Sequence, residues 1–324
     1  MKKLCAIGEA LIDFIPSQKG VCLKDVVSFQ RTAGGAPANV AAAVARLGGS
    51  SKVITQLGKD AFGDFLVATM QSYGIDTSDI QRSEEGDTAL AFVSLAEDGN
   101  RDFQFYRKTS ADLLLEPVQI QESMLDDCGI LHFCSVDLVE SPMRYAHKKL
   151  IELALAKQLT VSFDPNLRFP LWKDKEKLRQ TVLEFLPYAH ILKLSDEELE
   201  FISGKQTIKA ALPDLFVGNV SCVIYTMGKN GARAYHKSGF WVETAGYFVD
   251  AKDTTGAGDA FIGAFLYKLL MLGKDISICT EEETLEMLRF ANAYGAHTTT
   301  KQGVKTVFKP NEMMKKRRSL KIEC

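Results

Sequence analysis

The chain has 324 residues, of which 46% are hydrophobic and 25% are charged, so it resembles an ordinary globular protein with a sizeable core. Its formal net charge of −2 argues against a nucleic-acid binder, because such proteins usually carry a basic domain. The seven cysteines are scattered without a C-x-x-C pair, and no apolar run reaches the roughly 18 residues of a membrane span. We therefore expect a cytoplasmic protein that binds neither nucleic acid nor membrane.

The N-terminal segment predicts a buried strand that ends at a polar side chain. Residues 4–8 form a short continuous apolar run, which is typical of a strand inside a parallel sheet. Asp13 follows among apolar neighbours. Ligands of open α/β sheets collect at the carboxyl ends of strands, so Asp13 is a candidate substrate contact. The alternative is an ordinary turn residue.

A glycine turn and a helix of small residues come next. Gly34 and Gly35 precede a run of alanine and valine that ends at Gly48. Such a helix can pack closely against a sheet, and the glycine backbone is free to approach a ligand. Asn39, in the first turn, is one of the few hydrogen-bonding side chains of this helix.

Two separate segments, 20–36 and 86–110, differ from the rest of the chain in their residue pattern. Short strand-like runs occupy 26–31 and 89–95, a turn occupies 97–100, and 101–107 alternates polar and apolar residues up to Arg107. The pattern predicts a small antiparallel sheet beside the main domain. Such a sheet could close over a site or pair with its counterpart in a dimer.

From residue 129 onward the chain alternates strands and helices. We predict strands at 130–134, 160–163, 191–194 and 220–226, and helices at 145–157 and 175–185. This βαβ rhythm is typical of a parallel sheet covered by helices on both faces. We find no repeat and no linker, so residues 1–324 are expected to form one α/β domain.

Polar groups follow two of these strands. Asp164-Pro165-Asn166-Leu167-Arg168 begins at a strand end, and the proline helps to fix the loop. Asn166 and Arg168 suit sugar hydroxyls or phosphate oxygens, with a solvent loop as the alternative. The strand containing Lys193 leads into Ser195 and, three residues later, Glu198, a spacing that predicts a capping box at a helix start.

The most informative stretch is 252–263. Gly256 and Gly258 flank Ala257 where an apolar helix starts, so successive backbone N–H groups can turn toward one point. Unpaired N–H groups and the helix dipole favour an anion there. Asp259 lies in the same turn, and an anion hole beside a base suits phosphoryl transfer to an alcohol. The alternative is a glycine-rich loop with an aspartate cap.

Five motifs in this order resemble the ribokinase-like (PfkB) family of carbohydrate kinases over nearly the whole chain. They are Gly8-Glu9-Ala10-Leu11-Ile12-Asp13, Gly34-Gly35-Ala36-Pro37-Ala38-Asn39, Phe105-Tyr106-Arg107 with Ser110-Ala111-Asp112, Asp164-Pro165-Asn166-Leu167-Arg168, and Asp253 to Asp259. Within this family, the sequences of these motifs are most similar to those of the fructokinase subgroup. The resemblance implies a three-layer α/β/α core with a β-sheet lid, formed by segments near 14–36 and 86–111, that closes over the sugar and often forms a homodimer contact.

The resemblance also implies an activity and its residues. ATP would phosphorylate the 6-hydroxyl of fructose, with Asp259 as general base and the amides of Gly256, Ala257 and Gly258 as anion hole. Mg²⁺ would be bound through water by Glu198, and K⁺ by Asp253 and Thr255. The family carries asparagine where this chain has Ser195. The implied sugar contacts are Asp13, Gly34, Gly35, Asn39, Arg107, Asn166 and Arg168, and the implied nucleotide contacts are Lys193, Ser195, Thr226, Gly228, Gly231 and Asn292.

Other functions stay open at this point. A kinase for 2-keto-3-deoxygluconate, ribose or another sugar shares the scaffold, and Arg107 and Arg168 would suit an acid sugar. A dinucleotide-binding oxidoreductase is disfavoured, because no G-x-G-x-x-G follows the first strand. A non-catalytic sugar sensor is disfavoured by Asp259 and its flanking glycines, and a turnover assay would separate it from a kinase.

Overall fold

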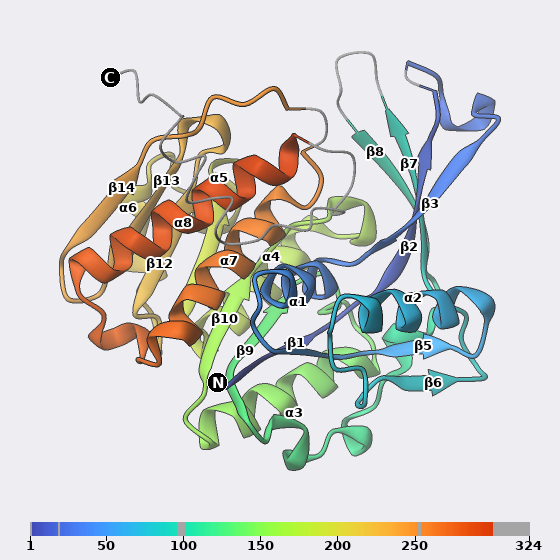
Figure 1. The fold of residues 1–324 in the computed structure, drawn as a ribbon, viewed down its shortest axis with the longest axis horizontal. Coiled ribbons are helices and arrows are strands. Elements are labelled where there is room, and N and C mark those ends of the chain that lie inside the picture. Colours follow the sequence, from blue (N-terminus) through green and yellow to red (C-terminus); the bar gives the residue numbers. More distant parts are fainter. Residues whose placement is uncertain (1, 19, 96–100, 252–253, 301–324) are drawn as a thin grey trace.

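The computed structural model describes residues 2–18, 20–95, 101–251 and 254–300 (Figure 1). Its centre is an eight-stranded sheet in the order β14-β13-β12-β11-β10-β9-β1-β4. The strands from β4 to β12 pair in parallel, and β13 and β14 extend the sheet by antiparallel pairs. The strands are β1 (Lys3–Ile7), β4 (Ser51–Ile54), β9 (Cys128–Cys134), β10 (Thr160–Asp164), β11 (Ile191–Ser195), β12 (Cys222–Thr226), β13 (Ala232–His236) and β14 (Trp241–Thr244).

Helices cover both faces of this sheet, as predicted for a three-layer α/β/α core. One apolar cluster joins the sheet to α3 (Pro142–Ala156), α4 (Lys175–Phe185), α5 (Asp196–Ser203) and α6 (Ile208–Leu215). Another joins the opposite face to α1 (Ala36–Arg46), α7 (Ala257–Leu272) and α8 (Glu281–Thr299) (Figure 1). Within the described ranges, no helix has both the length and the apolar character that crossing a bilayer would require.

A four-stranded sheet projects from the core beside α1 (Figure 1). It contains β2 (Leu11–Pro16), β3 (Phe29–Gly34), β7 (Leu90–Leu95) and β8 (Arg101–Tyr106), in the order β3-β2-β7-β8. The outer pairs are antiparallel, but the central pair β2–β7 is parallel, so the prediction of an antiparallel sheet is wrong for that pair. The two strands come from separate segments that leave the core in the same direction, and no hairpin connects them.

Local differences from the expected elements are small. The strand expected at 26–31 is β3, which starts at Phe29 after a 3₁₀ turn (Leu23–Asp25). The turn expected at 97–100 lies outside the described residues. A peripheral unit of β5 (Gln56–Gly58), β6 (Gln81–Ser83) and α2 (Ala61–Ser72) packs beside the base of the small sheet. The parallel strands β1, β9, β10, β11 and β12 bring their carboxyl ends to one edge, which is where ligands of such sheets bind.

Candidate active site

The centre of the site is the carboxylate of Asp259 in the first turn of α7. The helix begins after Gly256, whose φ of 70° is a conformation that glycine adopts without strain. The Asn39 side-chain amide donates to one Asp259 oxygen at 2.9 Å, and the Asn166 amide donates to the other at 3.1 Å. Asp259 is only 6% exposed. Side chains from α1 and from the loop after β10 therefore converge on a carboxylate of α7.

The surroundings of Asp259 tune its protonation. Burial raises the pKa of its carboxyl above the ordinary value, while Asn39, Arg168, Lys193 and Asn166 act in the opposite direction. From the sequence, only the positive end of the helix was expected to act on this pKa, by favouring the ionised carboxylate. The structure adds burial, which acts in the opposite direction and raises the pKa. A buried carboxylate held by two amide donors is a suitable proton acceptor for a bound hydroxyl.

The glycine turn is partly closed by its own backbone. The Ala257 N–H donates to the Thr254 carbonyl oxygen at 3.2 Å, and the Ala260 N–H closes the first helical turn on the Gly256 oxygen at 2.8 Å. The Ala257 amide is thus already used within the turn. The remaining amides, at the positive end of α7, keep the anion-hole role as a prediction. Asp253, expected to hold K⁺ with Thr255, lies outside the described residues.

The predicted sugar residues of the N-terminal half lie together. A Cβ atom on Gly34 would overlap the Asp13 carboxylate, so only glycine lets that carboxylate lie against β3. Gly35 precedes α1 with a φ of 106°, and a Cβ there would overlap the backbone oxygen of Glu9. Asn39 follows in the first turn of α1. Asp13, Gly34, Gly35 and Asn39 therefore border one region that Asp259 also borders.

Glu198 ties two strand ends together. The backbone N–H and the hydroxyl of Ser195 donate to one of its oxygens at 2.8 and 2.9 Å, which confirms the predicted capping box. The Leu167 N–H donates to the other oxygen at 2.9 Å and anchors the loop that carries Asn166. Burial alone would raise the pKa of Glu198, but Lys193 and these donors bring it below the ordinary value.

This arrangement bears on Mg²⁺, which usually keeps several waters and takes one or two carboxylates together with substrate phosphates. Both Glu198 oxygens already accept hydrogen bonds from the protein. The side chain therefore fits a contact through water better than direct coordination. Among the described residues, no three histidine, cysteine, aspartate or glutamate side chains are grouped closely enough to hold a metal ion by themselves.

The predicted nucleotide residues gather around the turn between β12 and β13. Thr226 ends β12, and its hydroxyl donates to the Leu194 oxygen at 3.4 Å; Gly228 opens the turn. Gly231 packs against the backbone that follows β14. The Asn292 amide on α8 donates to Ala245 in that backbone at 2.7 Å. Their contact with ATP stays a prediction.

Two basic side chains complete the site. Arg168 is half-buried, donates to the Leu167 oxygen at 3.2 Å and lowers the pKa of Asp259. Lys193 on β11 is buried, and its ammonium lies 2.8 Å from a carboxylate oxygen of Asp164 at the end of β10. Asp164 was not among the predicted site residues, although it opens the Asp-Pro-Asn motif. Its position at a strand end was the available signal.

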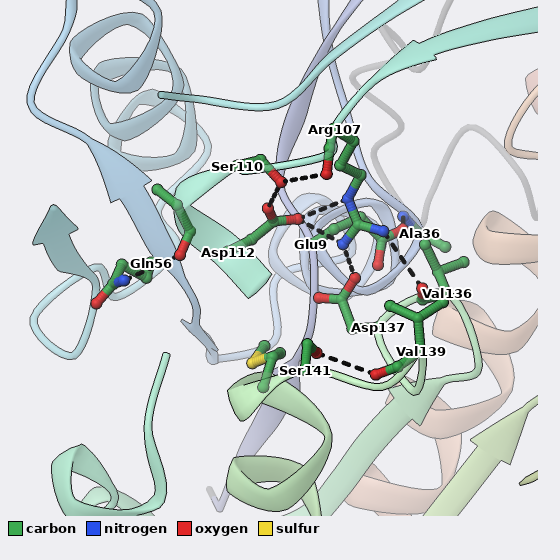
Figure 2. A network of polar contacts seen from close by, with 12 residues as sticks. Glu9, Ala36, Gln56, Arg107, Ser110, Asp112, Val136, Asp137, Val139 and Ser141 are labelled. Atoms are coloured by element: carbon green, nitrogen blue, oxygen red, sulfur yellow. Dashed lines mark hydrogen bonds and ion pairs between the residues drawn. The ribbon is translucent and has the colours of Figure 1, made fainter. Parts of the chain in front are cut away.

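Arg107 lies in a buried network at the base of the small sheet (Figure 2). Its Nε and Nη2 donate to one Asp112 oxygen at 2.8 and 2.5 Å, Nη2 also pairs with Asp137, and Nη1 donates to the Val136 oxygen at 3.3 Å. All three guanidinium nitrogens thus contact protein acceptors, and the sugar contact of Arg107 stays a prediction. Asp137 was not among the predicted residues, and its place as a lone acid among apolar residues after β9 was the available signal.

Glu9 borders the same network and caps α1. One of its oxygens accepts the Ala36 N–H at 2.7 Å. Burial raises the pKa of Glu9 to about 7, although Arg107 and the amide contacts oppose the rise.

We expect Glu9→Gln to remove a pH dependence of stability. The ordinary pKa of 4.5 lies below the folded value of about 7, so between them the folded protein holds a proton that the unfolded chain releases. The free energy of unfolding of the wild type therefore loses this contribution as pH rises through that window. Glutamine keeps the acceptor for Ala36 and does not titrate. Urea unfolding at about pH 5 and about pH 8 should show the variant gaining relative to the wild type at the higher pH; a constant difference would contradict the assignment.

Comparisons with known proteins identify the family of the chain and several relatives. The family model described as pfkB family carbohydrate kinase matches residues 1–311. The chain is 43% identical over 300 residues to a probable fructokinase-2 of Arabidopsis thaliana, covering 92% of this chain and 90% of that protein. A fructokinase from Xylella fastidiosa, solved with bound ATP, superposes with a TM-score of 0.88 at 33% identity, covering 98% and 99% of the two chains. A double mutant of a Vibrio cholerae O395 fructokinase, solved with fructose, ADP and potassium ion, has a TM-score of 0.84 at 31% identity, covering 97% and 98%.

Proposed function

The chain belongs to the pfkB family of carbohydrate kinases, and on that premise we propose that it transfers the γ-phosphoryl group of ATP to the 6-hydroxyl of D-fructose. The observation that carries the proposal is the buried Asp259 carboxylate, held by Asn39 and Asn166 at the start of α7. The fructose named with the Vibrio cholerae enzyme and the names of the plant and bacterial relatives support this sugar.

The reaction assigns a task to each part of the site. The fructose hydroxyl oxygen forms the new bond to the γ-phosphorus, the bond from phosphorus to the ADP oxygen breaks with its electron pair, and the hydroxyl proton passes to Asp259. The amides of Gly256 and Gly258, which remain after Ala257 bonds to Thr254, stabilise the charge on the moving group. Mg²⁺, held through water by Glu198, would neutralise phosphate charge when bound. The acceptor sugar is oriented by Asp13, Gly34, Gly35, Asn39, Asn166 and Arg168, while Arg107 supports this side of the site through its buried network.

The remaining parts of the proposal concern the nucleotide, the small sheet and the oligomer. ATP lies along the β12–β13 turn, near Thr226, Gly228 and Gly231, with Asn292 on the adenine side. The small sheet acts as a lid that closes over the sugar and excludes water from the transferring group. The same sheet forms the contact of a homodimer.

A turnover assay tests the function directly. We would measure ATP-dependent phosphorylation of fructose, 2-keto-3-deoxygluconate, ribose, mannose and glucose. The expected result is a preference for fructose. Preference for the acid sugar would keep the kinase and overturn the substrate. Binding of a sugar without turnover of any would overturn the kinase in favour of a sensor.

We expect Asn39→Ala to shift the pH profile of the reaction. The base must be ionised, so activity rises with pH through the pKa of Asp259. Asn39 lowers that pKa, and its removal should move the acidic limb of kcat/KM to higher pH. Asn219→Ala, at an exposed asparagine, is the matched control and should leave the limb in place. An unmoved limb in Asn39→Ala would show that another group titrates.

A monovalent cation should increase the activity. The proposed ligands are Asp253 and the carbonyl of Thr255, next to the glycine turn, and potassium is named with the Vibrio cholerae relative. We expect higher turnover in K⁺ than in tetramethylammonium at equal ionic strength, because the large cation cannot enter an oxygen cage. Equal turnover in both salts would contradict the cation site.

A further inference from the structure

The buried ion pair of Lys193 and Asp164 points toward the start of α7, the turn that carries Asp259. Side chains alternate along a strand, so Lys193 points away from the face to which Leu192 and Leu194 contribute and toward the face covered by α7. Phe163 belongs to the first face, which directs Asp164 to the same side as Lys193. The register pairs Phe163 with Leu192, so the two charged residues follow side by side on β10 and β11.

The ammonium of Lys193 reaches the glycine turn. A Cβ atom placed on Gly258 would lie 3.4 Å from its Nζ. Burial alone lowers the pKa of Lys193, but Asp164, Glu198 and Asp259 outweigh that effect and raise it, so the side chain is a cation. The start of a helix already carries partial positive charge. A buried ammonium at that end is unfavourable by itself, and the combination suits an anionic ligand.

We propose that Lys193 contacts the phosphoryl group during its transfer and that Asp164 is a positioning residue that holds the Lys193 ammonium beside the Gly258 turn. This inference rests on the proposed kinase function and deepens it. Lys193 supplies the cation that a P-loop lysine supplies in other phosphoryl-transfer sites, but it does so from a strand under the helix. The Asp164 carboxylate lies 2.8 Å from the Lys193 ammonium and so holds it beside the turn.

The alternative is a structural role, in which Lys193 only neutralises Asp164, Glu198 and Asp259. The two roles differ in what removal of the lysine does. If the role is structural, removal of Lys193 changes stability and leaves turnover by the folded protein nearly intact. A lysine on the phosphoryl group changes kcat, because it acts in the transition state more than in the ground state.

The test is a double-mutant cycle with whichever sugar the wild type phosphorylates, using Lys193→Met, Asp164→Asn and both together. Loss of one transition-state donor should lower kcat by on the order of 10²–10³-fold in Lys193→Met, with the dissociation constant of the sugar unchanged. A misplaced ammonium should lower kcat by up to about 10²-fold in Asp164→Asn. The double variant should match Lys193→Met, because Asp164 acts through the lysine.

Lys52→Met is the matched control. Lys52 is also a buried lysine, and it pairs with the carboxylate of Asp79. It lies on β4, a strand of the same sheet, but outside the site. It should lose stability and keep kcat. Should Lys193→Met fail to fold, Lys193→Arg keeps the charge with a different shape and should fold with a reduced kcat.

Three results would overturn the inference. One is a kcat of Lys193→Met, or of Lys193→Arg as its substitute, within a few-fold of the wild type. Another is an Asp164→Asn effect of the same size with or without the lysine, which would mean that Asp164 acts on its own, for example through the metal. The third is loss of stability alone, as in Lys52→Met. A wild type that phosphorylates no sugar would instead refute the proposed function.

Discussion

Asp259→Asn should lower kcat by on the order of 10²–10⁴-fold, because a positioned general base contributes about that factor. The substitution keeps the size of the side chain and removes its ability to accept a proton. Asn39 and Asn166 both donate to the present carboxylate, and an asparagine can offer an oxygen to only one of them. Sugar binding should persist, since the proposed contacts of Asp13 and Gly34 are unchanged.

The measurement is a steady-state assay with fructose beside direct titration of sugar binding. Asp196→Asn is the matched control, because Asp196 is also in the first turn of a helix, α5, but is exposed. It should retain the kcat of the wild type. If Asp259→Asn kept kcat within a few-fold, Asp259 could not be the base, and its burial with two amides would have to be structural.

The convergence of the candidate residues at the carboxyl edge of the sheet was predictable, because each of them belongs to a local sequence pattern. Strand ends, glycine turns and a capping box are all readable from adjacent residues, and the sheet topology needs only the βαβ rhythm. The three layers, α7 and the Ser195–Glu198 box were therefore predicted correctly. The contacts of Asp259 were beyond such reasoning: its partners are 220 and 93 residues away, so their hydrogen bonds exist only after the chain has folded.

Two other features also could not be predicted from local sequence patterns. The parallel pairing of β2 with β7 depends on how two distant segments leave the core, which side-chain alternation within either segment does not specify. Use of the Ala257 amide by Thr254 depends on the backbone path before α7. Both are properties of chain geometry rather than of residue type.

Arg107 shows most clearly that a local sequence motif does not specify the contacts of a residue in the folded protein. The motif around it resembles that of sugar kinases, and an arginine beside a sugar site suggests a ligand contact. The structure surrounds it with Asp112, Asp137 and Glu9, and these carboxyl groups come from three separate segments (Figure 2). An acid sugar brought to this side would meet carboxylates already engaged with the one arginine. That arrangement favours a neutral sugar over 2-keto-3-deoxygluconate in the proposed function.

Arg107→Met should lower the free energy of unfolding by about 3–5 kcal/mol, which is the usual cost of removing one partner from a buried ion pair. The side chains of Asp112 and Asp137 are each 1% exposed, so the variant leaves two carboxylates without their shared cation. Urea unfolding without ligand measures the loss. Arg144→Met is the control, since its partners Glu140 and Glu184 are 54% and 43% exposed, and the expected change is below about 1 kcal/mol.

Neutralising the carboxylates separates charge from packing. Adding Asp112→Asn and Asp137→Asn to Arg107→Met should recover part of the lost stability, because the remaining groups can be buried without charge. A loss below about 1 kcal/mol in Arg107→Met would mean that Arg107 does not hold this network in solution. The guanidinium would then be available to the sugar, and the preference for a neutral substrate would have to come from elsewhere in the site.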